Sequence, residues 1–567
     1  MFFSDVSHPV EGIINPLTKV PRMVRKLLLS LCLMSAFVAS AHADAPIARS
    51  PKALKNRYIV TFKDSVSASQ VNGLAKALTH QHGGRLLATM TAAIHGFGVE
   101  LPEAAVQGLS RNPAIALIEE DQLIELASDG SERDKAAAPR FDFRGMKRPA
   151  PPIATSTTSC TWDASGYYVC GFTNDTFWNL DRIDNTGQLY SVKAYAYNSM
   201  GTNVRAYVVD SGVYADHSEF EGRVVSGANM MVDPDIADAK QRSDEEEPIS
   251  ALDYALETNP CFGWQTSNAD AGAGHGTAVA SVLGGNTTGV AKNVTIVPVK
   301  IVACNGEGSM LAMARGLDWI YKDMKCPNKP AADVDDPDTY PGCEARTNRA
   351  VVNMSVIADA NFGNIYCEDP HASGGYSLCI PSIEHEVNTL IGGNIPVVVA
   401  AGNQNNGNCI KSPSRLGYGN EAAVPSTYRT ITVGATAFDP STYTDQRWSC
   451  VNTPAQCPSP PWNSTNDPGS NYGKCVSIWA PGWSVKVAGA AGSSSYRSAG
   501  QFSTGTSFAT PLVTGAVARL LQWYPTLTAQ QVWTELVNRA NQRVNPPDFD
   551  PLSTVFNNKL VYMSPFE

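Results

Sequence analysis

The strongest constraint on the fold is an alternation of apolar strand-like runs and helix-like segments that begins near residue 202 of the 567-residue chain. The strand-like runs are rich in valine and isoleucine, and longer stretches with helical periodicity separate them. This order predicts an α/β fold in which helices cover a mainly parallel sheet. We expect strands at 204–209, 295–302, 350–356, 396–401 and 430–435, and helices at 309–324, 382–390, 512–521 and 529–540.

Three segments of this region carry candidate catalytic side chains. Asp210 follows the run 204–209, His275 lies among small residues in GAGHGTAVAS (272–281), and Ser507 lies in GTSFATP (505–511) before an apolar helix-like run. Sites form at the carboxyl ends of parallel strands, and a helix start offers N–H donors to an oxyanion. Each residue also has a simpler interpretation: a turn cap for Asp210, a structural histidine for His275 and an N-cap for Ser507.

In this order the three segments resemble the Asp, His and Ser signatures of the subtilisin-like serine proteases (peptidase S8), and the proteinase K branch fits best. The resemblance covers about residues 178–525 and implies a subtilisin-like three-layer fold with a mainly parallel central sheet. Supporting segments are WNLDRID (178–184), RAYVVD (205–210), CNGEGS (304–309), and SNYGKC (470–475) followed by APG (480–482).

The resemblance implies a serine endopeptidase with Ser507 as nucleophile, His275 as its base and Asp210 as the group that orients the imidazole. A serine hydroxyl is a weak nucleophile at neutral pH, so it needs a base, and the base needs a fixed tautomer. Asn403, in VVVAAGN (397–403), matches the family's oxyanion-hole asparagine. A turn residue after a buried strand is the simpler interpretation of Asn403.

By the same resemblance, a peptide substrate is expected to lie as an added strand between two chain segments. Backbone hydrogen bonds would supply affinity, and side-chain pockets would supply preference. The matching segments are Gly306, Glu307 and Gly308 on one flank, Ser355, Val356 and Ile357 on the other, and Ala400, Ala401 and Gly402 as the far wall of the specificity pocket.

The sequence departs from the family pattern at several positions. SVIA (355–358) stands where SLGG is usual, so we expect Ile357 and Ala358 to narrow or redirect the specificity pocket. Ala278 replaces a usual second histidine after His-Gly-Thr, and Ser281 replaces a common glycine. Because neither of these belongs to the triad, we expect changed packing near His275 and retained chemistry.

The sequence argues against two other functions. A catalytically silent binding protein could keep this fold, but all four chemical positions are present in their expected motifs. An α/β-hydrolase esterase would need GxSxG after a strand and the histidine last in the chain, and Ser507 meets neither condition. The net charge of −10 argues against a nucleic-acid partner. We expect protein or peptide substrates and a monomer without a membrane anchor.

Residues 1–43 are typical of a secretory signal peptide. Basic residues precede an apolar core at 27–38, which is too short for a membrane span and ends in ASAHA (39–43). Met23 is an alternative translation start. These features predict a secreted protein, extracellular or periplasmic in transit.

Cysteine usage agrees with export. Of 13 cysteines, Cys32 belongs to the signal segment, which leaves an even set. Zinc ligation is the rival interpretation, but the sequence has no Cys-x-x-Cys and no His-Glu-x-x-His. Local spacing predicts the disulfides Cys160–Cys170, Cys326–Cys343, Cys367–Cys379 and Cys450–Cys457, and the resemblance to secreted bacterial relatives implies Cys261–Cys304 and Cys409–Cys475.

Residues 50–126 form a separate predicted unit. Strand-like runs at 57–63, 95–101 and 114–120 flank helix-like segments at 68–80 and 103–111, a βαββαβ-like order. The pattern resembles the inhibitor-type (I9) propeptide of this family, a small α+β ferredoxin-like domain whose tail occupies the cleft until it is cut. An independent small binding domain is the alternative.

A polar, proline-rich linker at 127–159 should contain or adjoin the maturation site, and the peptidase domain should span 160–567. No cofactor is expected for catalysis. DVDDPD (333–338) has oxygen ligands but lacks the EF-hand glycine and spacing. Ser477 stands where the family's calcium site often has an aspartate. A structural calcium ion is therefore left open.

Overall fold

The computed structural model divides into two compact units, residues 1–44 and 45–567. All the helices and strands named below belong to the second unit. Within the described residues, no helix has both the length and the apolar character needed to cross a membrane. The predicted signal peptide and the linker up to residue 158 lie outside them. The structure describes residues 44–126, 159–162, 168–171, 177–184, 194–231, 270, 274–303, 306, 308–326, 345–360, 365–368, 376–407, 411–417, 429–439, 444–449, 469–497, 503–542, 544–545 and 559–563.

A mainly parallel sheet forms the centre of the fold, in the order β11-β12-β10-β13-β17-β19-β21-β24-β22. Its pairings from β11 to β24 along this order are parallel, and the edge pair β22–β24 is antiparallel. The predicted α/β fold with a parallel central sheet is confirmed. The strands are β10 (Val204–Asp210), β11 (Ala228–Asn229), β12 (Thr295–Lys300), β13 (Arg349–Met354), β17 (Val397–Ala400), β19 (Ile431–Asp439), β21 (Ile478–Pro481), β22 (Asn541–Gln542) and β24 (Lys559–Leu560).

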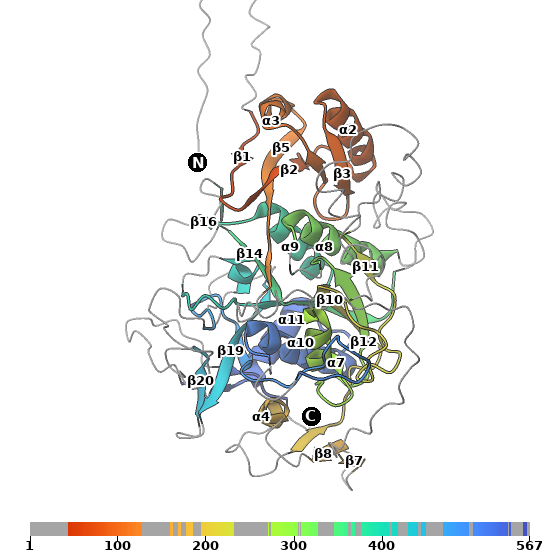
Figure 1. Ribbon diagram of the computed structural model, residues 1–567, viewed down its shortest axis with the longest axis vertical. Coiled ribbons are helices and arrows are strands. Elements are labelled where there is room, and N and C mark those ends of the chain that lie inside the picture. Colours follow the sequence, from red (N-terminus) through yellow and green to blue (C-terminus); the bar gives the residue numbers. More distant parts are fainter. Residues whose placement is uncertain are drawn as a thin grey trace, which may run out of the picture. The chain divides into compact units, whose positions relative to one another are not determined.

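Helices cover both faces of this sheet, because its strands are apolar on both sides. Ala206 and Val208 of β10 belong to the core that contains α7 (His275–Gly284) and α10 (Thr506–Trp523). Tyr207 and Val209 belong to the core that contains α8 (Met310–Lys325) and α9 (Pro381–Gly392). Figure 1 shows α8 and α9 on one side of the sheet and α10 and α11 (Ala529–Arg539) on the other. The result is a three-layer molecule.

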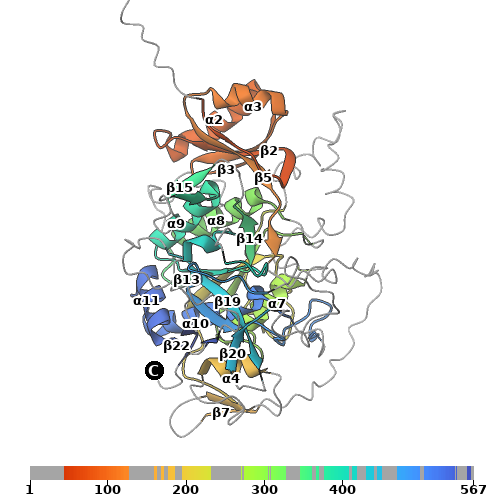
Figure 2. The same cartoon turned by 90° about the vertical axis from the view of Figure 1, so that its left-hand side faces the viewer.

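Residues 45–126 fold into a small α+β layer, called the N-terminal subdomain below. Its sheet has the order β1-β5-β2-β4-β3, and Figure 2 shows both of its helices on one face. The strand at 85–90 was not predicted from the sequence. The elements are β1 (Ile47–Ala48), β2 (Ala53–Phe62), α2 (Ala68–Gln81), β3 (Arg85–Met90), β4 (Gly96–Glu100), α3 (Glu103–Ser110) and β5 (Ile115–Gln122).

The predicted strand 350–356 is in fact divided at Ser355. β13 ends at Met354 in the central sheet, and β14 (Val356–Asp359) pairs antiparallel with β18 (Lys411–Ser412) and with β6 (Glu125–Leu126). The chain therefore leaves the parallel sheet at its carboxyl edge. This change of direction makes β14 available to a strand from elsewhere in the chain.

Short elements complete the described chain. They are β7 (Ser159–Trp162), β8 (Tyr168–Gly171), α4 (Trp178–Asp184), β9 (Ala194–Tyr197), β15 (Tyr366–Glu368), β16 (Tyr376–Leu378), η4 (Ser414–Gly417), β20 (Thr444–Arg447) and β23 (Val544–Asn545).

One disulfide is described completely, between Cys367 and Cys379, with an S–S distance of 2.06 Å. Cys170, Cys326 and Cys475 are also disulfide-bonded. The antiparallel register of β7 and β8 places Cys160 opposite Cys170. The residues Cys261, Cys304, Cys343, Cys409, Cys450 and Cys457 lie outside the described residues, so the pairings Cys261–Cys304, Cys326–Cys343, Cys409–Cys475 and Cys450–Cys457 stay predictions.

Candidate active site

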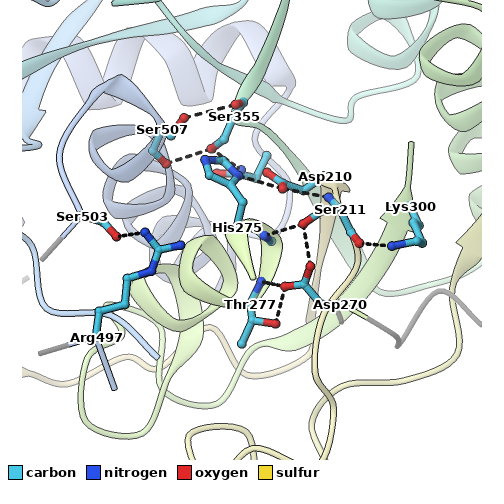
Figure 3. Close-up of polar contacts among 12 residues, drawn as sticks. Asp210, Ser211, Asp270, His275, Thr277, Lys300, Ser355, Arg497, Ser503 and Ser507 are labelled. Atoms are coloured by element: carbon cyan, nitrogen blue, oxygen red, sulfur yellow. Dashed lines mark hydrogen bonds and ion pairs between the residues drawn. The ribbon is translucent and has the colours of Figure 1, made fainter. Parts of the chain in front are cut away.

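Asp210 and His275 form a buried pair at the carboxyl edge of the central sheet. Asp210 is the last residue of β10, and His275 is the first residue of α7. The imidazole Nδ1 lies 2.8 Å from Asp210 Oδ1, and both side chains are buried. Because a carboxylate only accepts hydrogen bonds, Nδ1 carries the proton and Nε2 is the basic nitrogen. Figure 3 shows the imidazole ring between Asp210 and Ser507.

Glycines permit the close approach of the two elements. A Cβ at Gly276 would lie 2.1 Å from the Gly212 carbonyl oxygen, so a larger residue would separate α7 from the turn after β10. Gly274 has φ +60°, a left-handed conformation that glycine adopts readily. The small residues around His275 therefore set its distance from Asp210.

Ser507 lies in the first turn of α10, where Pro511 shapes its surroundings. Pro511 has no N–H, so the Ser507 carbonyl lacks its usual donor four residues later. The Ser355 hydroxyl donates to that carbonyl at 2.9 Å instead. In return, the Ser507 hydroxyl donates to the Ser355 carbonyl at 3.2 Å. This reciprocal pair, visible in Figure 3, ties the start of α10 to the chain between β13 and β14.

Asn403 follows β17 and contacts the residue before Ser507. Its Oδ1 accepts from both the N–H and the hydroxyl of Thr506, each at 2.9 Å. The Thr506 hydroxyl also accepts from the Gly402 N–H at 3.1 Å. Since these contacts engage the oxygen of the Asn403 amide, its NH2 group is directed away from Thr506. The structure therefore brings Asn403, His275 and Ser507 to one edge of the sheet.

The two segments predicted to bind substrate flank a strand of the N-terminal subdomain. β6 pairs antiparallel with β14, with Leu126 opposite Val356 and Glu125 opposite Ile357. On the other side, the Ile124 N–H donates to the Gly308 carbonyl at 3.1 Å, and Leu123 forms an isolated antiparallel β-bridge with Ser309. A Cβ at Gly308 would lie 2.4 Å from the Ile301 carbonyl oxygen and 2.9 Å from Ile124 Cδ1. Glycine at 308 thus lets the strand approach closely.

The remaining predicted substrate residues are placed as follows. Gly306 has φ +83°, and Glu307 lies outside the described residues. Ala400 ends β17, Ala401 donates its N–H to the Val433 carbonyl at 3.0 Å, and Gly402 has φ +99°. Since β13 and β17 are neighbours with Met354 opposite Val399, residues 400–402 and 355–357 leave the sheet side by side.

Four residues that were not predicted from the sequence hold Asp210 and His275 in place. Asp270 accepts from the Ser211 hydroxyl at 2.7 Å and from the Thr277 N–H at 2.7 Å. The Ser211 hydroxyl accepts from the Gly276 N–H at 2.9 Å, and Lys300 donates to the Ser211 carbonyl. The only sequence signal for Ser211, Asp270 and Thr277 was their nearness to the two motifs, and Lys300 had none.

The charges of this network are buried. Burial raises the pKa of Asp270, and the nearby Lys300 charge opposes that shift. Burial lowers the pKa of Lys300, against the attraction of Asp270 and Asp210. The network joins the residue after Asp210 to the first turn of α7.

The family's calcium position near β21 does not suit an ion here. The Ser477 hydroxyl donates to the Gly417 carbonyl at 2.7 Å and accepts from the Trp533 indole N–H at 3.2 Å. Those protein contacts engage a neutral side chain where a carboxylate would be needed. Within the part of the chain that the structure describes, no cluster of three His, Cys, Asp or Glu residues could hold a metal ion. The segment 333–338 lies outside that part.

Asp210, His275 and Ser507, at the carboxyl edge of a three-layer fold, are the side chains that a serine peptidase uses. The chain belongs to the subtilase family: the profile described as the subtilase family matches residues 201–553. A second profile, the peptidase inhibitor I9, matches residues 57–127. The predicted family and the predicted serine proteinase activity are thereby confirmed, together with the I9 propeptide domain. Members of the family need no cofactor for catalysis.

Two curated relatives span most of the chain. The extracellular serine proteinase of Thermus sp. (strain Rt41A) is 30% identical over 91% of this chain and 93% of its own. The alkaline proteinase of Hapsidospora chrysogena is 25% identical over 84% of this chain and 85% of its own. The crystal structure of fervidolysin from Fervidobacterium pennivorans, 19% identical, has a TM-score of 0.51 over 92% of this chain and 62% of that chain. At that identity it supports the fold alone.

Proposed function

We propose that this protein is a secreted endopeptidase made as an autoprocessed zymogen, and that Asp210, His275 and Ser507 are its catalytic triad. The observation that carries the proposal is the 2.8 Å contact between His275 Nδ1 and Asp210 Oδ1. The imidazole ring lies between Asp210 and Ser507 (Figure 3). Subtilase membership and a relative named as extracellular support the activity and the destination.

The first half of the reaction forms an acyl-enzyme. When a peptide binds, the Ser507 hydroxyl turns from the Ser355 carbonyl to His275 Nε2, gives up its proton and attacks the peptide carbonyl carbon. The Ser507 N–H and the Asn403 NH2 group donate to the resulting oxyanion. The imidazolium, stabilised by Asp210, then protonates the amine, which leaves as the C–N bond breaks.

The second half regenerates the serine. Water gives a proton to His275 and attacks the ester carbonyl, and the tetrahedral intermediate expels the Ser507 oxygen, which recovers that proton. No cofactor takes part. Asn403 is assigned to both halves because Thr506 fixes its amide through Oδ1, and the NH2 group of that amide is the donor that the oxyanion would use. Loss of one such donor typically lowers kcat about a hundred- to a thousandfold.

The N-terminal subdomain acts as an intramolecular inhibitor in this proposal. Residues 123–126 occupy the strand position that a substrate would need, between Gly308 and β14. The tail is therefore both the first substrate and, after the cut, a competing ligand. The maturation cut is assigned to the segment that begins at 127.

Expression of the wild type beside Ser507→Ala tests the proposal. We expect the wild type to separate from its N-terminal subdomain and to hydrolyse peptides. The alanine variant should remain full length and inactive while showing the circular dichroism spectrum of a folded α/β protein. A variant that matures and cleaves peptides would contradict the proposal, and a stable, inactive wild type would support the binding-protein alternative.

A further inference from the structure

Ile357 reaches across the gap between the two walls of the expected specificity pocket. A Cβ built on Gly402 would lie only 2.9 Å from Ile357 Cδ1, so the isoleucine side chain touches the opposite wall. Ile357 is fully buried, at 0% exposure. Its neighbours in β14, Val356 and Ala358, belong to the core shared with α8 and α9. Contrary to the expectation from sequence, Ala358 therefore faces this core, and Ile357 alone spans the gap.

The register of β14 shows which substrate residue would meet Ile357. Leu126 lies opposite Val356, so the residue that follows in an antiparallel strand would lie opposite Ser355. A residue opposite Ser355 lies beside Ser507, whose hydroxyl is 3.2 Å from the Ser355 carbonyl oxygen, and we assign the attacked carbonyl to that residue. This is the residue on the acyl side of the scissile bond.

The side chain of that residue projects toward Ile357. Opposite residues of an antiparallel pair carry their side chains on one face, and residues two apart in a strand share that face. A side chain opposite Ser355 therefore lies on the face of Ile357 and points into the gap between β14 and Gly402. Long side chains reach such diagonal neighbours, at about 7–8 Å.

We propose that Ile357 restricts the acyl-side residue of the substrate to glycine, alanine or serine. This inference rests on the proposed function, since it assumes that Ser507 is the nucleophile. A methyl group fits beside Ile357, whereas a phenyl or isobutyl group would have to displace a buried side chain that contacts both walls. Overpacking of this kind is disfavoured in a close-packed interior.

The chain's own sequence agrees with this restriction. The residue after Leu126 is Ala127, followed by Ser128. Ala127 lies outside the described residues, and its role here comes from sequence order alone. If the tail is the first substrate, the cut falls between Ala127 and Ser128, after a small residue.

The test compares the matured wild type and Ile357→Gly on two peptides, acetyl-Ala-Ala-Ala-p-nitroanilide and acetyl-Ala-Ala-Phe-p-nitroanilide. We expect the wild type to favour the alanine peptide in kcat/KM by roughly 10- to 200-fold, the range that pocket size alone can supply. Ile357→Gly should raise kcat/KM for the phenylalanine peptide by a similar factor, so that the preference for the alanine peptide is lost. Ile357→Val, a milder change, should shift the ratio in the same direction if the glycine variant fails to fold.

Ile391→Ala is the matched control, because Ile391 is buried in α9 outside the cleft. It should lower the melting temperature and leave the ratio of the two kcat/KM values unchanged. Mass spectrometry of the released N-terminal fragment should place its end at Ala127. The inference is overturned if the wild type prefers the phenylalanine peptide, or if substitution of Ile357 leaves the ratio of the two kcat/KM values unchanged. Either result leaves the role of Ser507 intact. The proposed function itself is overturned if the wild type cleaves neither of the two peptides and also fails to cleave unfolded protein.

Discussion

At the scale of single residues, the site depends on side chains that form hydrogen bonds with backbone groups outside regular helix or sheet pairing. Pro511 removes the donor that the Ser507 carbonyl would have in a regular helix, and Ser355 supplies another from a different strand. Asn403 is held in the same way by Thr506. The motif around Ser507 was recognisable in the sequence, as were Ser355 and Asn403, but the contacts among these residues were not, because they join positions more than a hundred residues apart.

Ser355→Ala should destabilise the protein through this carbonyl. The change leaves a buried acceptor without its hydroxyl donor, which costs about 1–3 kcal/mol in the free energy of unfolding. Urea unfolding of both proteins in the Ser507→Ala background, where self-digestion is prevented, measures the difference. Ser493→Ala, at an exposed serine, is the control and should change stability by less than about 0.5 kcal/mol. Equal effects of the two substitutions would count against the role given to Ser355.

At the scale of elements, carboxylates join the N-terminal subdomain to the two helices beneath it. Asp121 in β5 accepts from the Leu311 N–H at the start of α8, at 3.0 Å. From the other side, Asp318 in α8 accepts from the Thr91 and Ala92 N–H groups at 3.1 and 2.7 Å. Glu119 in β5 faces the start of α9 at Ser382. This interface therefore buries acidic groups as well as apolar surface.

Glu119 makes the interface sensitive to pH. Burial raises the pKa of its carboxyl to about 8, against hydrogen bonds from Ser382 that lower it, and the Glu384 charge adds to the rise. Burial likewise raises the pKa of Glu386 well above its usual range, with Asp318 adding to the rise and Lys322 opposing it. A carboxyl with a raised pKa in the folded state stabilises that state below its unfolded pKa of about 4.3. The contribution falls as the pH rises and is lost near pH 8.

Glu119→Gln should remove this part of the pH dependence. The amide keeps an acceptor for Ser382 and does not ionise, so its stability relative to the glutamate protein should increase steadily from pH 5 to pH 8. Urea unfolding of the full chain in the Ser507→Ala background gives both curves. Glu103→Gln, at an exposed glutamate in α3 that pairs with Arg49, is the control and should change the free energy of unfolding by less than about 1 kcal/mol. Parallel curves for Glu119→Gln would contradict the role of Glu119.

At the scale of the whole molecule, the features that could be predicted from the sequence are those set by local apolar pattern and by the order of the motifs. The strands that deliver Asp210 and Asn403, and the helix that contains Ser507, lie close to the expected positions because apolar runs mark them. The pairing of β6 with β14, and the direction in which the Ile357 side chain points, could not be predicted from local pattern or motif order. They depend on contacts between residues more than two hundred positions apart and on the division of one apolar run at Ser355.

The most direct test of the triad is the reaction of the matured protein with phenylmethanesulfonyl fluoride, followed by peptide mapping. A base that takes the hydroxyl proton should make Ser507 the single labelled serine, with loss of activity in proportion to labelling. His275→Ala should slow the labelling by more than about a hundredfold. To obtain that variant in the same form, the N-terminal subdomain is removed by an added protease. Labelling of a different residue, or equal labelling rates with and without His275, would contradict the account.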